Sequence, residues 1–179
     1  GDFTYYLSTI LAMKGNVLVA DNSYAGDLFT SLCHSTEDNL FEWKNITYVR
    51  NLDVNGSNTE GYEYILIYAG LDLEGRYSSY KDIVVLAMPD YTKQCLDTLR
   101  EHLPVEENTV LYILRDMCSK KITNKAAATY LNVSPKVIAG ALPLNEKDIS
   151  SYISFTHNKR QSFKSVSADM ETALEYVAT

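Results

Sequence analysis

The sequence predicts an α/β protein with a doubly wound, mostly parallel sheet and helices on both faces. Candidate strands and helices alternate along the 179 residues, and such alternation implies right-handed βαβ crossovers. Most candidate strands are continuous apolar runs, as expected where helices cover both faces of a parallel sheet. The length suits one α/β domain, which we expect to span residues 1–179.

The expected strands are short apolar runs separated by turn signals. They cover Asn16–Asp21, Ile46–Asn51, Tyr64–Ala69, Asp82–Met88, Thr109–Arg115 and Val137–Pro143. Gly15 stands where a helix C-terminal cap belongs, directly before the first strand. The segment Asp53–Gly61, rich in Asn, Gly and Ser, is the clearest loop.

The expected helices lie between and beside these strands. They cover Phe3–Met13, Ala25–Cys33, Tyr91–His102, Ile122–Leu131, Glu146–His157 and Ser165–Val177. The third carries leucines at spacings of three and four, at Leu96, Leu99 and Leu103. The last repeats this pattern with Val166, Met170, Leu174 and Val177. Both patterns are typical of a helix with one apolar face.

Composition and charge exclude several classes of function. The net charge of −7 argues against direct nucleic-acid binding, because affinity for the phosphate backbone comes mostly from Lys and Arg. The apolar runs are far shorter than the roughly 20 residues that span a bilayer, and no secretory segment is visible. The three cysteines have no paired spacing and the histidines are isolated. We therefore expect a cytoplasmic protein without disulfides and without a metal site.

The segment Gly15–Leu32 carries the clearest functional signal. It reads as a buried strand that ends in Asp21, followed by a turn with Gly26 and an amphipathic helix. Open α/β sheets bind ligands at the carboxyl ends of their strands, so Asp21 can orient a phosphate-bound metal or a water there. Alternatively Asp21 caps the following turn, since Asp-Asn-Ser is turn chemistry. Gly26 is explained by the backbone conformation of the turn.

The order of segments resembles the ParA/MinD-type ATPases, which have a deviant P-loop, over nearly the whole chain. Asp21 matches that family's strand-end aspartate and Gly26 its turn glycine. The other matching segments are the end of a P-loop with its helix (1–12), the strand of the switch segment (64–70), the next unit (82–90), a further strand (109–115), and the strand and proline turn over the adenine (137–145). The resemblance implies a P-loop NTPase-like fold whose first strand, upstream of the P-loop, is missing from this chain.

The residues that carry the family's chemistry are replaced. Asp2 stands in place of the Lys that contacts the phosphates, and Phe3 in place of the Ser or Thr that binds magnesium. Tyr68 stands where a carboxylate would support the metal, and Leu114 or Arg115 where an amide would read adenine. A carboxylate about 4 Å from a phosphate repels it by about 4 kcal/mol at an effective dielectric constant of about 20. We therefore expect a degenerate member that needs no cofactor, with ATP and Mg²⁺ as the alternative.

The resemblance implies a bacterial, cytoplasmic protein that works as a scaffold or partner-binding module in positioning, partition, secretion or pilus machinery. Its partner would be a protein, either a second copy in a homodimer or a related ATPase in a heterodimer. Asp21 and Gly26 would be vestigial cofactor-binding residues. No catalytic residue is expected, and the expected interaction residues are Tyr24, Tyr68 and Tyr91, since tyrosines are favoured at interface cores.

Two alternatives stay open. The first is an active ParA/MinD-type nucleotide hydrolase whose P-loop lies upstream of this chain. The second is a receiver-like signalling domain, because Val17–Asp21 resembles the first strand of that fold. A receiver requires an acidic pair at the first strand, a phosphorylatable Asp ending the middle strand and a Lys ending the last. Asn22, Tyr68 and Arg115 do not meet these requirements.

Overall fold

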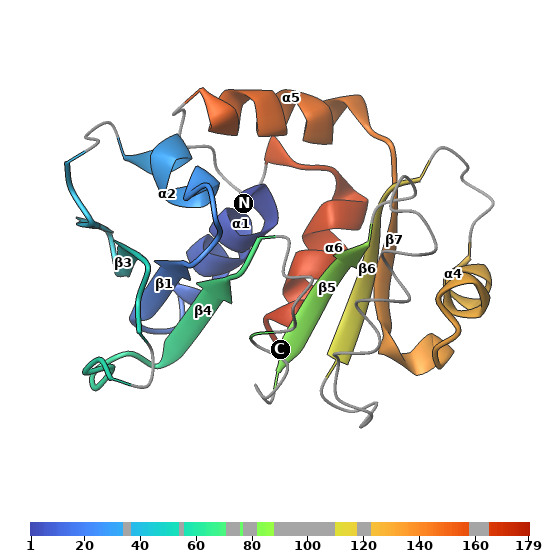
Figure 1. Cartoon of the computed structure of the whole chain (residues 1–179). Coiled ribbons are helices and arrows are strands. Elements are labelled where there is room, and N and C mark those ends of the chain that lie inside the picture. The colour runs from blue at the N-terminus through green and yellow to red at the C-terminus, as the bar shows by residue number, and fades with distance from the viewer. Residues whose placement is uncertain are drawn as a thin grey trace. The chain divides into compact units, whose positions relative to one another are not determined.

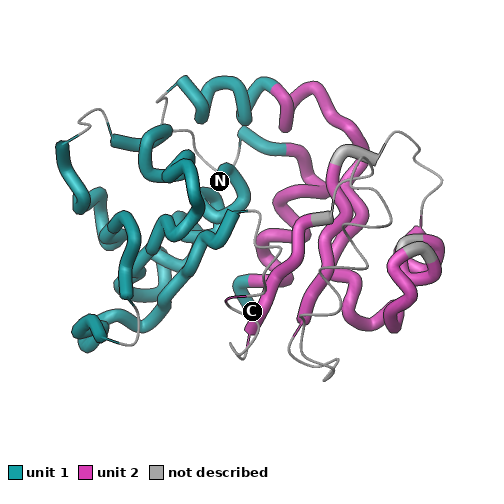
Figure 2. Tube along the Cα trace, viewed as in Figure 1, with its two compact units in different colours: residues 1–71, 150–166, 178–179 teal, residues 72–149, 167–177 magenta. Residues whose placement is uncertain are grey.

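The computed structural model describes residues 1–33, 37–53, 56–70, 76, 82–87, 110–117, 123–157 and 165–179. The chain divides into two compact units (Figure 2). The first unit comprises Gly1–Leu71, Ser150–Val166 and Ala178–Thr179, and the second comprises Asp72–Ile149 and Ser167–Val177. In the part of the chain so described, no helix is both long enough and apolar enough to cross a membrane.

The first unit is built on a four-stranded sheet. Its elements are α1 (Asp2–Leu11), β1 (Val17–Asp21), α2 (Asp27–Leu32), β2 (Leu40–Trp43), β3 (Ile46–Arg50) and β4 (Tyr64–Tyr68) (Figure 1). The strand order is β2-β3-β1-β4, with β1 parallel to both of its neighbours and β2 antiparallel to β3. Parallel pairing places the carboxyl ends of β1, β3 and β4 at one edge.

Buried and half-buried aromatic side chains hold α1, α2 and the β2–β3 hairpin together. Phe41 of β2 stacks on Tyr48 at 4.8 Å between ring centroids and meets Phe29 edge-on at 5.1 Å. The Ser8 hydroxyl donates to the carbonyl oxygen of Tyr5 at 2.7 Å and lies 3.0 Å from the Tyr48 hydroxyl. Because Ser8 has one hydroxyl proton, Tyr48 is the donor in the second contact. The phenol at the centre of the core is therefore satisfied.

The second unit contains a three-stranded parallel sheet in the order β5-β6-β7. The strands are β5 (Ile83–Ala87), β6 (Val110–Met117) and β7 (Ile138–Pro143). They are accompanied by α4 (Asn124–Leu131), the 3-10 helix η2 (Pro135–Val137) and α6 (Ala168–Val177), while α5 (Glu146–Thr156) begins in this unit. The apolar core comprises Val85, Val110, Tyr112, Leu114, Ala128, Leu131, Val137 and Ile138.

Local signals explain where α4 begins and ends. The Thr123 hydroxyl accepts a hydrogen bond from the backbone N–H of Ala126 at 3.2 Å, as an N-cap does. At the other end Asn132 takes the left-handed conformation with φ 53°, which Asn tolerates better than most residues. These caps frame a helix that starts two residues after the predicted Ile122 and ends at the predicted Leu131.

The predicted α/β class is confirmed, and the described strands lie within one or two residues of their expected bounds. The strands form two sheets, however, with β4 at an edge of one and β5 at an edge of the other.

The antiparallel β2 was not predicted, because only Phe41 and Trp43 of this short strand face inward. Gly15 is not in a left-handed cap: α1 ends at Leu11, although the Gly15 N–H donates to the Leu11 carbonyl at 3.1 Å. The expected helix Tyr91–His102 lies outside the described residues.

The turn between β2 and β3 gives a stability test. Lys44 has a φ of 57°, a conformation that costs a residue with a Cβ about 1 to 2 kcal/mol. Its ammonium also lies 4.5 Å from the centroid of the Trp43 ring, a contact that Lys44→Ala and Lys44→Gly remove equally. Lys44→Gly should therefore be the more stable of the two by about 1 kcal/mol in urea unfolding.

Lys125, exposed within α4, is the control position. Here Lys125→Gly should be less stable than Lys125→Ala by about 1 kcal/mol, because glycine is less favourable than alanine inside a helix. If Lys44→Gly were likewise less stable than Lys44→Ala, residue 44 would not have the left-handed conformation.

Candidate functional site

The carboxyl edge of the first sheet brings together the ends of its parallel strands. The pairing register sets Asp21, the last residue of β1, opposite Arg50 of β3 on one side and Tyr68 of β4 on the other. Ligands of open α/β sheets bind at this kind of edge. It is therefore the candidate functional site of the first unit.

Asp21 is 2% exposed and makes hydrogen bonds to the turn that follows it. Its Oδ1 accepts from the backbone N–H of Ser23 at 3.1 Å and from the Ser23 hydroxyl at 2.5 Å. Its Oδ2 accepts from the backbone N–H of Phe29 in α2 at 2.8 Å. Both carboxylate oxygens are thus engaged by the turn and the helix, which agrees with the capping interpretation of Asp21. A role toward a ligand stays a prediction.

Ser23, Gly26 and Gly70 shape the turn. The Ser23 Oγ accepts from the Gly26 N–H at 3.1 Å, and Gly26 has φ 60°, a conformation that favours glycine. Gly70 also has a positive φ, 65°, and a Cβ on it would lie 2.8 Å from the Ser23 Cβ. Only glycine permits this close approach of the β4 end to the turn.

Asp27 extends the network toward Tyr68. Its Oδ1 lies 2.9 Å from the Ser23 hydroxyl and its Oδ2 accepts from the Tyr68 hydroxyl at 3.1 Å. The single Ser23 proton can serve only one of its two carboxylate neighbours at a time. A Cβ on Gly1 would lie 3.5 Å from the Asp27 Oδ2, so the start of α1 also borders this group.

Tyr68 lies among negative charges. Burial is the largest cause that raises its pKa above the ordinary value of 10, followed by the charge of Asp27 and its hydrogen bond. The charges of Asp21 and Asp2 raise the Tyr68 pKa further. Asp2 itself is 3% exposed in the first turn of α1. The edge is therefore acidic, and its phenol stays protonated at physiological pH.

Arg50 carries a positive charge at the same edge, but its contacts are with α2. Its Nη2 donates to the Thr30 hydroxyl at 2.9 Å, and its guanidinium carbon lies 4.6 Å from the centroid of the Phe29 ring. Its buried Nε has no hydrogen-bond partner among the described residues. The Arg50 guanidinium therefore holds α2 against β3. The strand register alone, which sets Arg50 opposite Asp21, does not show these contacts.

The structure places the other predicted residues in different surroundings. Tyr24 is fully exposed at the tip of the turn, while Tyr91 lies outside the described residues. Phe3 is buried in the core of the first unit, where its ring offers no ligand to a metal. Leu114 and Arg115 belong to β6 of the second unit, and Leu114 is buried there. Sequence reasoning missed Ser23, Asp27 and Arg50 as members of the edge; the acidic first turn of α2 was the available signal for Asp27.

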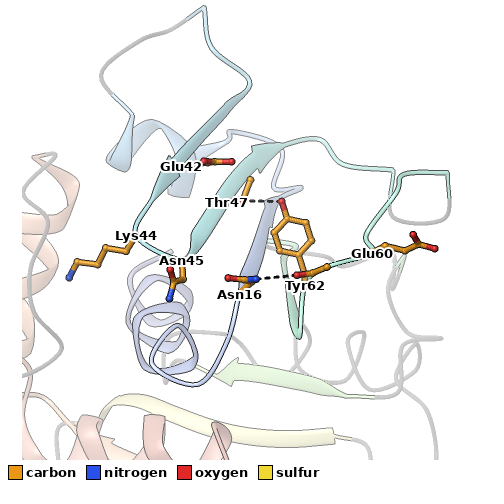
Figure 3. Close-up of a pocket in the computed structure, with 8 residues that line it drawn as sticks. Asn16, Glu42, Lys44, Asn45, Thr47, Glu60 and Tyr62 are labelled. Atoms are coloured by element: carbon orange, nitrogen blue, oxygen red, sulfur yellow. Dashed lines mark hydrogen bonds between the residues drawn. The ribbon is translucent and has the colours of Figure 1, made fainter.

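A polar pocket of about 340 Å³ lies at the opposite, amino ends of β1, β3 and β4 (Figure 3). Its lining residues are Asn16, Glu42, Lys44, Asn45, Thr47, Glu60, Gly61 and Tyr62. The Tyr62 hydroxyl donates to the Thr47 hydroxyl at 3.1 Å, and the Asn16 amide donates to the Gly61 carbonyl at 3.3 Å. The polar groups near the strands are thus paired with one another, and the charged ones are exposed.

The donor set of the carboxyl edge does not fit Mg²⁺–ATP. Asp2 and Asp27 supply carboxylates to this edge, whereas a phosphate contact needs a cation, and Tyr68 supplies a protonated phenol, whereas a metal needs an anionic oxygen. Among the described residues, no group of three or more His, Cys, Asp or Glu side chains is arranged to hold a metal ion.

Tyr68 predicts a specific alkaline instability. Because the pKa of Tyr68 is raised in the folded state, its protonated form contributes stability that is complete below pH 10 and falls as the pH rises above 10. Tyr68→Phe should lose about 1 kcal/mol at pH 8 through the lost hydrogen bond to Asp27. Its unfolding free energy should then fall less steeply than that of the wild type between about pH 10 and 12.

Asp27→Asn is the matched control for the cause of this shift. It should reduce the alkaline slope in the wild-type background in part, because burial continues to raise the Tyr68 pKa, and leave the slope unchanged in the Tyr68→Phe background. Equal slopes for wild type and Tyr68→Phe would contradict the assignment.

Comparison with known proteins identifies the fold. No protein-family model and no curated protein sequence matches the chain. A ParA family ATPase from Chlorobium tepidum TLS matches with a TM-score of 0.61 and 14% identity, over 98% of this chain and 90% of that chain. A chain of the MinC:MinD cell division protein complex from Aquifex aeolicus matches with a TM-score of 0.60 and 14% identity, over 96% of this chain and 87% of that chain. A putative plasmid partition protein from Borrelia burgdorferi B31, bound to AMPPNP, matches with a TM-score of 0.59 and 14% identity, over 98% of this chain and 91% of that chain. The chain therefore has the ParA/MinD-type fold.

Proposed function

We propose that this chain is a degenerate ParA/MinD-like protein that does not hydrolyse ATP and acts as a scaffold or partner-binding module. The observation that carries the proposal is the acidic edge around Tyr68, where the charges of Asp27, Asp21 and Asp2 all disfavour further negative charge. A helix N-terminus such as that of α1 ordinarily attracts phosphate. In this chain the first turn of α1 carries the buried carboxylate of Asp2 instead.

Magnitudes favour this interpretation over weak nucleotide binding. Each carboxylate about 4 Å from a phosphate charge costs about 4 kcal/mol at an effective dielectric constant of about 20. Loss of a cationic phosphate contact adds to this cost, because charged hydrogen bonds contribute about 1.5 to 3 kcal/mol each. A millimolar Kd corresponds to only about 4 kcal/mol of binding free energy. Repulsion of this size is enough to remove measurable binding.

The structural relatives support a role through protein contacts. One of them is a chain of the MinC:MinD cell division protein complex, so the fold is compatible with assembly with another protein. The fully exposed Tyr24 at the tip of the turn gives this chain an aromatic side chain at the same edge. We propose a bacterial, cytoplasmic setting and a partner in positioning or partition machinery.

The alternative function is an active nucleotide hydrolase whose phosphate-binding loop comes from residues upstream of this chain. One observation favours it: β4 pairs with β1, and in the part of the chain that the structure describes its other edge pairs with no strand. An added strand could bond there. The MgATP experiment below separates the two functions when it is also run on a longer chain with the natural upstream residues.

Thermal unfolding with MgATP tests the proposal. A ligand that binds only the folded state at one hundred times its Kd stabilises it by about 2.7 kcal/mol, or roughly 5 to 10 °C for a chain of this size. We expect no shift for residues 1–179 at millimolar MgATP, while a ParA-type ATPase measured alongside shows one. A reproducible rise for this chain would refute the loss of nucleotide binding.

A further inference from the structure

The polar pocket at the amino ends of β1, β3 and β4 lies within the first unit, at the opposite ends of these strands from the carboxyl edge. Its volume of about 340 Å³ is that of a small-molecule site, which ordinarily spans roughly 300 to 1,000 Å³. Apart from Gly61, every described residue that lines it carries a polar side chain. A lining of this kind favours a strongly polar ligand over an apolar one.

Strand pairing builds the floor of the pocket. Glu42 of β2 lies directly opposite Thr47 of β3 in the antiparallel pair, so both side chains are on the same face of the sheet. Thr47 is 8% exposed, and its hydroxyl accepts the hydrogen bond of the Tyr62 hydroxyl at 3.1 Å. Because two hydroxyls share this single bond, one O–H proton of the pair has no acceptor among the described residues. Buried polar groups ordinarily have a partner, and a ligand in the pocket would supply it.

The other polar atoms of the pocket are mostly acceptors. The side-chain amides of Asn16 and Asn45 each donate to a backbone carbonyl, at 3.3 and 3.4 Å. Their side-chain oxygens accept no hydrogen bond from a described residue. Glu42 and Glu60 are exposed and form no ion pair with any residue that the structure describes. A ligand for this lining must therefore be rich in N–H donors.

Opposite charges lie on either side of the floor. Lys44 is on one side of the group and Glu60 on the other, with Thr47 and Tyr62 between them (Figure 3). The Lys44 ammonium lies 4.5 Å from the centroid of the Trp43 ring and, in the described part of the chain, forms no ion pair. With Glu42 included, the lining has a net charge of −1. This pattern fits a ligand that carries a carboxylate at one end, a cation at the other, and a net positive charge.

We propose that this pocket binds a free cationic amino acid. Its α-carboxylate meets Lys44, its α-ammonium meets Glu42 on the same strand side, and its side-chain cation meets Glu60. A guanidinium suits the floor best, because its planar fork of N–H donors can reach the oxygens of Asn16 and Asn45 together. The three charged side chains are exposed, so each contact is weak and the Kd is on the order of 1 mM.

Titration with L-arginine, followed by the amide signals of the ¹⁵N-labelled whole chain at constant pH and ionic strength, tests this site. The backbone amides of Asn16, Thr47 and Gly61 should shift and saturate with a Kd of about 1 mM, while those of Asp21 and Asp27 at the carboxyl edge stay in place. Shifts that do not saturate by about 20 mM, or that centre on the carboxyl edge, would overturn the proposal, because they would report only attraction of a cation to an acidic surface.

Two analogues separate a built site from such general attraction. Agmatine lacks the α-carboxylate and carries two positive charges, and citrulline has a neutral urea group in place of the guanidinium. Each should bind about threefold more weakly than L-arginine, because each loses one charged contact. An acidic surface without a site prefers agmatine, the more cationic of the three. Agmatine binding as tightly as L-arginine would therefore contradict the proposal.

Matched variants identify the side chains that read the two ends of the ligand. Lys44→Met should abolish the preference for L-arginine over agmatine, and Glu60→Gln should abolish the preference over citrulline, each leaving the other preference intact. Lys125→Met, at an exposed lysine of the second unit, should change neither. A Lys44→Met variant that keeps its full preference over agmatine would overturn the proposal. Nucleotide takes no part in these measurements, so their failure leaves the proposed loss of ATP binding untouched.

Discussion

The buried carboxylate of Asp21 is the constraint on which the carboxyl edge of the first unit depends. A charge at 2% exposure must be hydrogen-bonded to be tolerated. Its donors are backbone N–H groups of Ser23 and Phe29 and the Ser23 hydroxyl. These bonds fix the path from β1 into α2, and the left-handed Gly26 completes that path.

The same bonds hold the carboxylate itself in place. Both of its oxygens accept hydrogen bonds from the protein, Oδ1 from Ser23 and Oδ2 from Phe29 of α2. The neighbouring Asp27 and Tyr68 satisfy each other at 3.1 Å. The charges of Asp2, Asp21 and Asp27 around Tyr68 make this edge acidic. An acidic edge with the fully exposed Tyr24 beside it supports the proposed role toward a protein partner.

Continuous apolar runs made most of the fold predictable from the sequence. Val17–Asp21 and Ile46–Arg50 consist largely of apolar and β-branched residues, which favour a buried strand, and their ends follow from turn residues. The hairpin strand Leu40–Trp43 could not be predicted in the same way, because its inward Phe41 and Trp43 pack on Phe29 of α2 and Tyr5 of α1, which only the tertiary fold brings to them. At the site, Asp21 and Gly26 were visible as a strand end and a turn. Arg50 and Tyr68 became their neighbours only through the pairing register, which no local pattern encodes.

Helix α5 shows a further limit of pattern reading. The sequence predicted a helix over Glu146–His157, and the structure has one over Glu146–Thr156. Periodicity by itself would turn Ile149 and Ile153 toward the core. The fold turns Asp148 and Ser151 inward instead, because these side chains close the turn around Ser165 and Ser167 that leads into α6. The inward side of α5 therefore combines the buried Phe155 with these two hydrogen-bonding side chains, while Ile149 and Ile153 stay exposed.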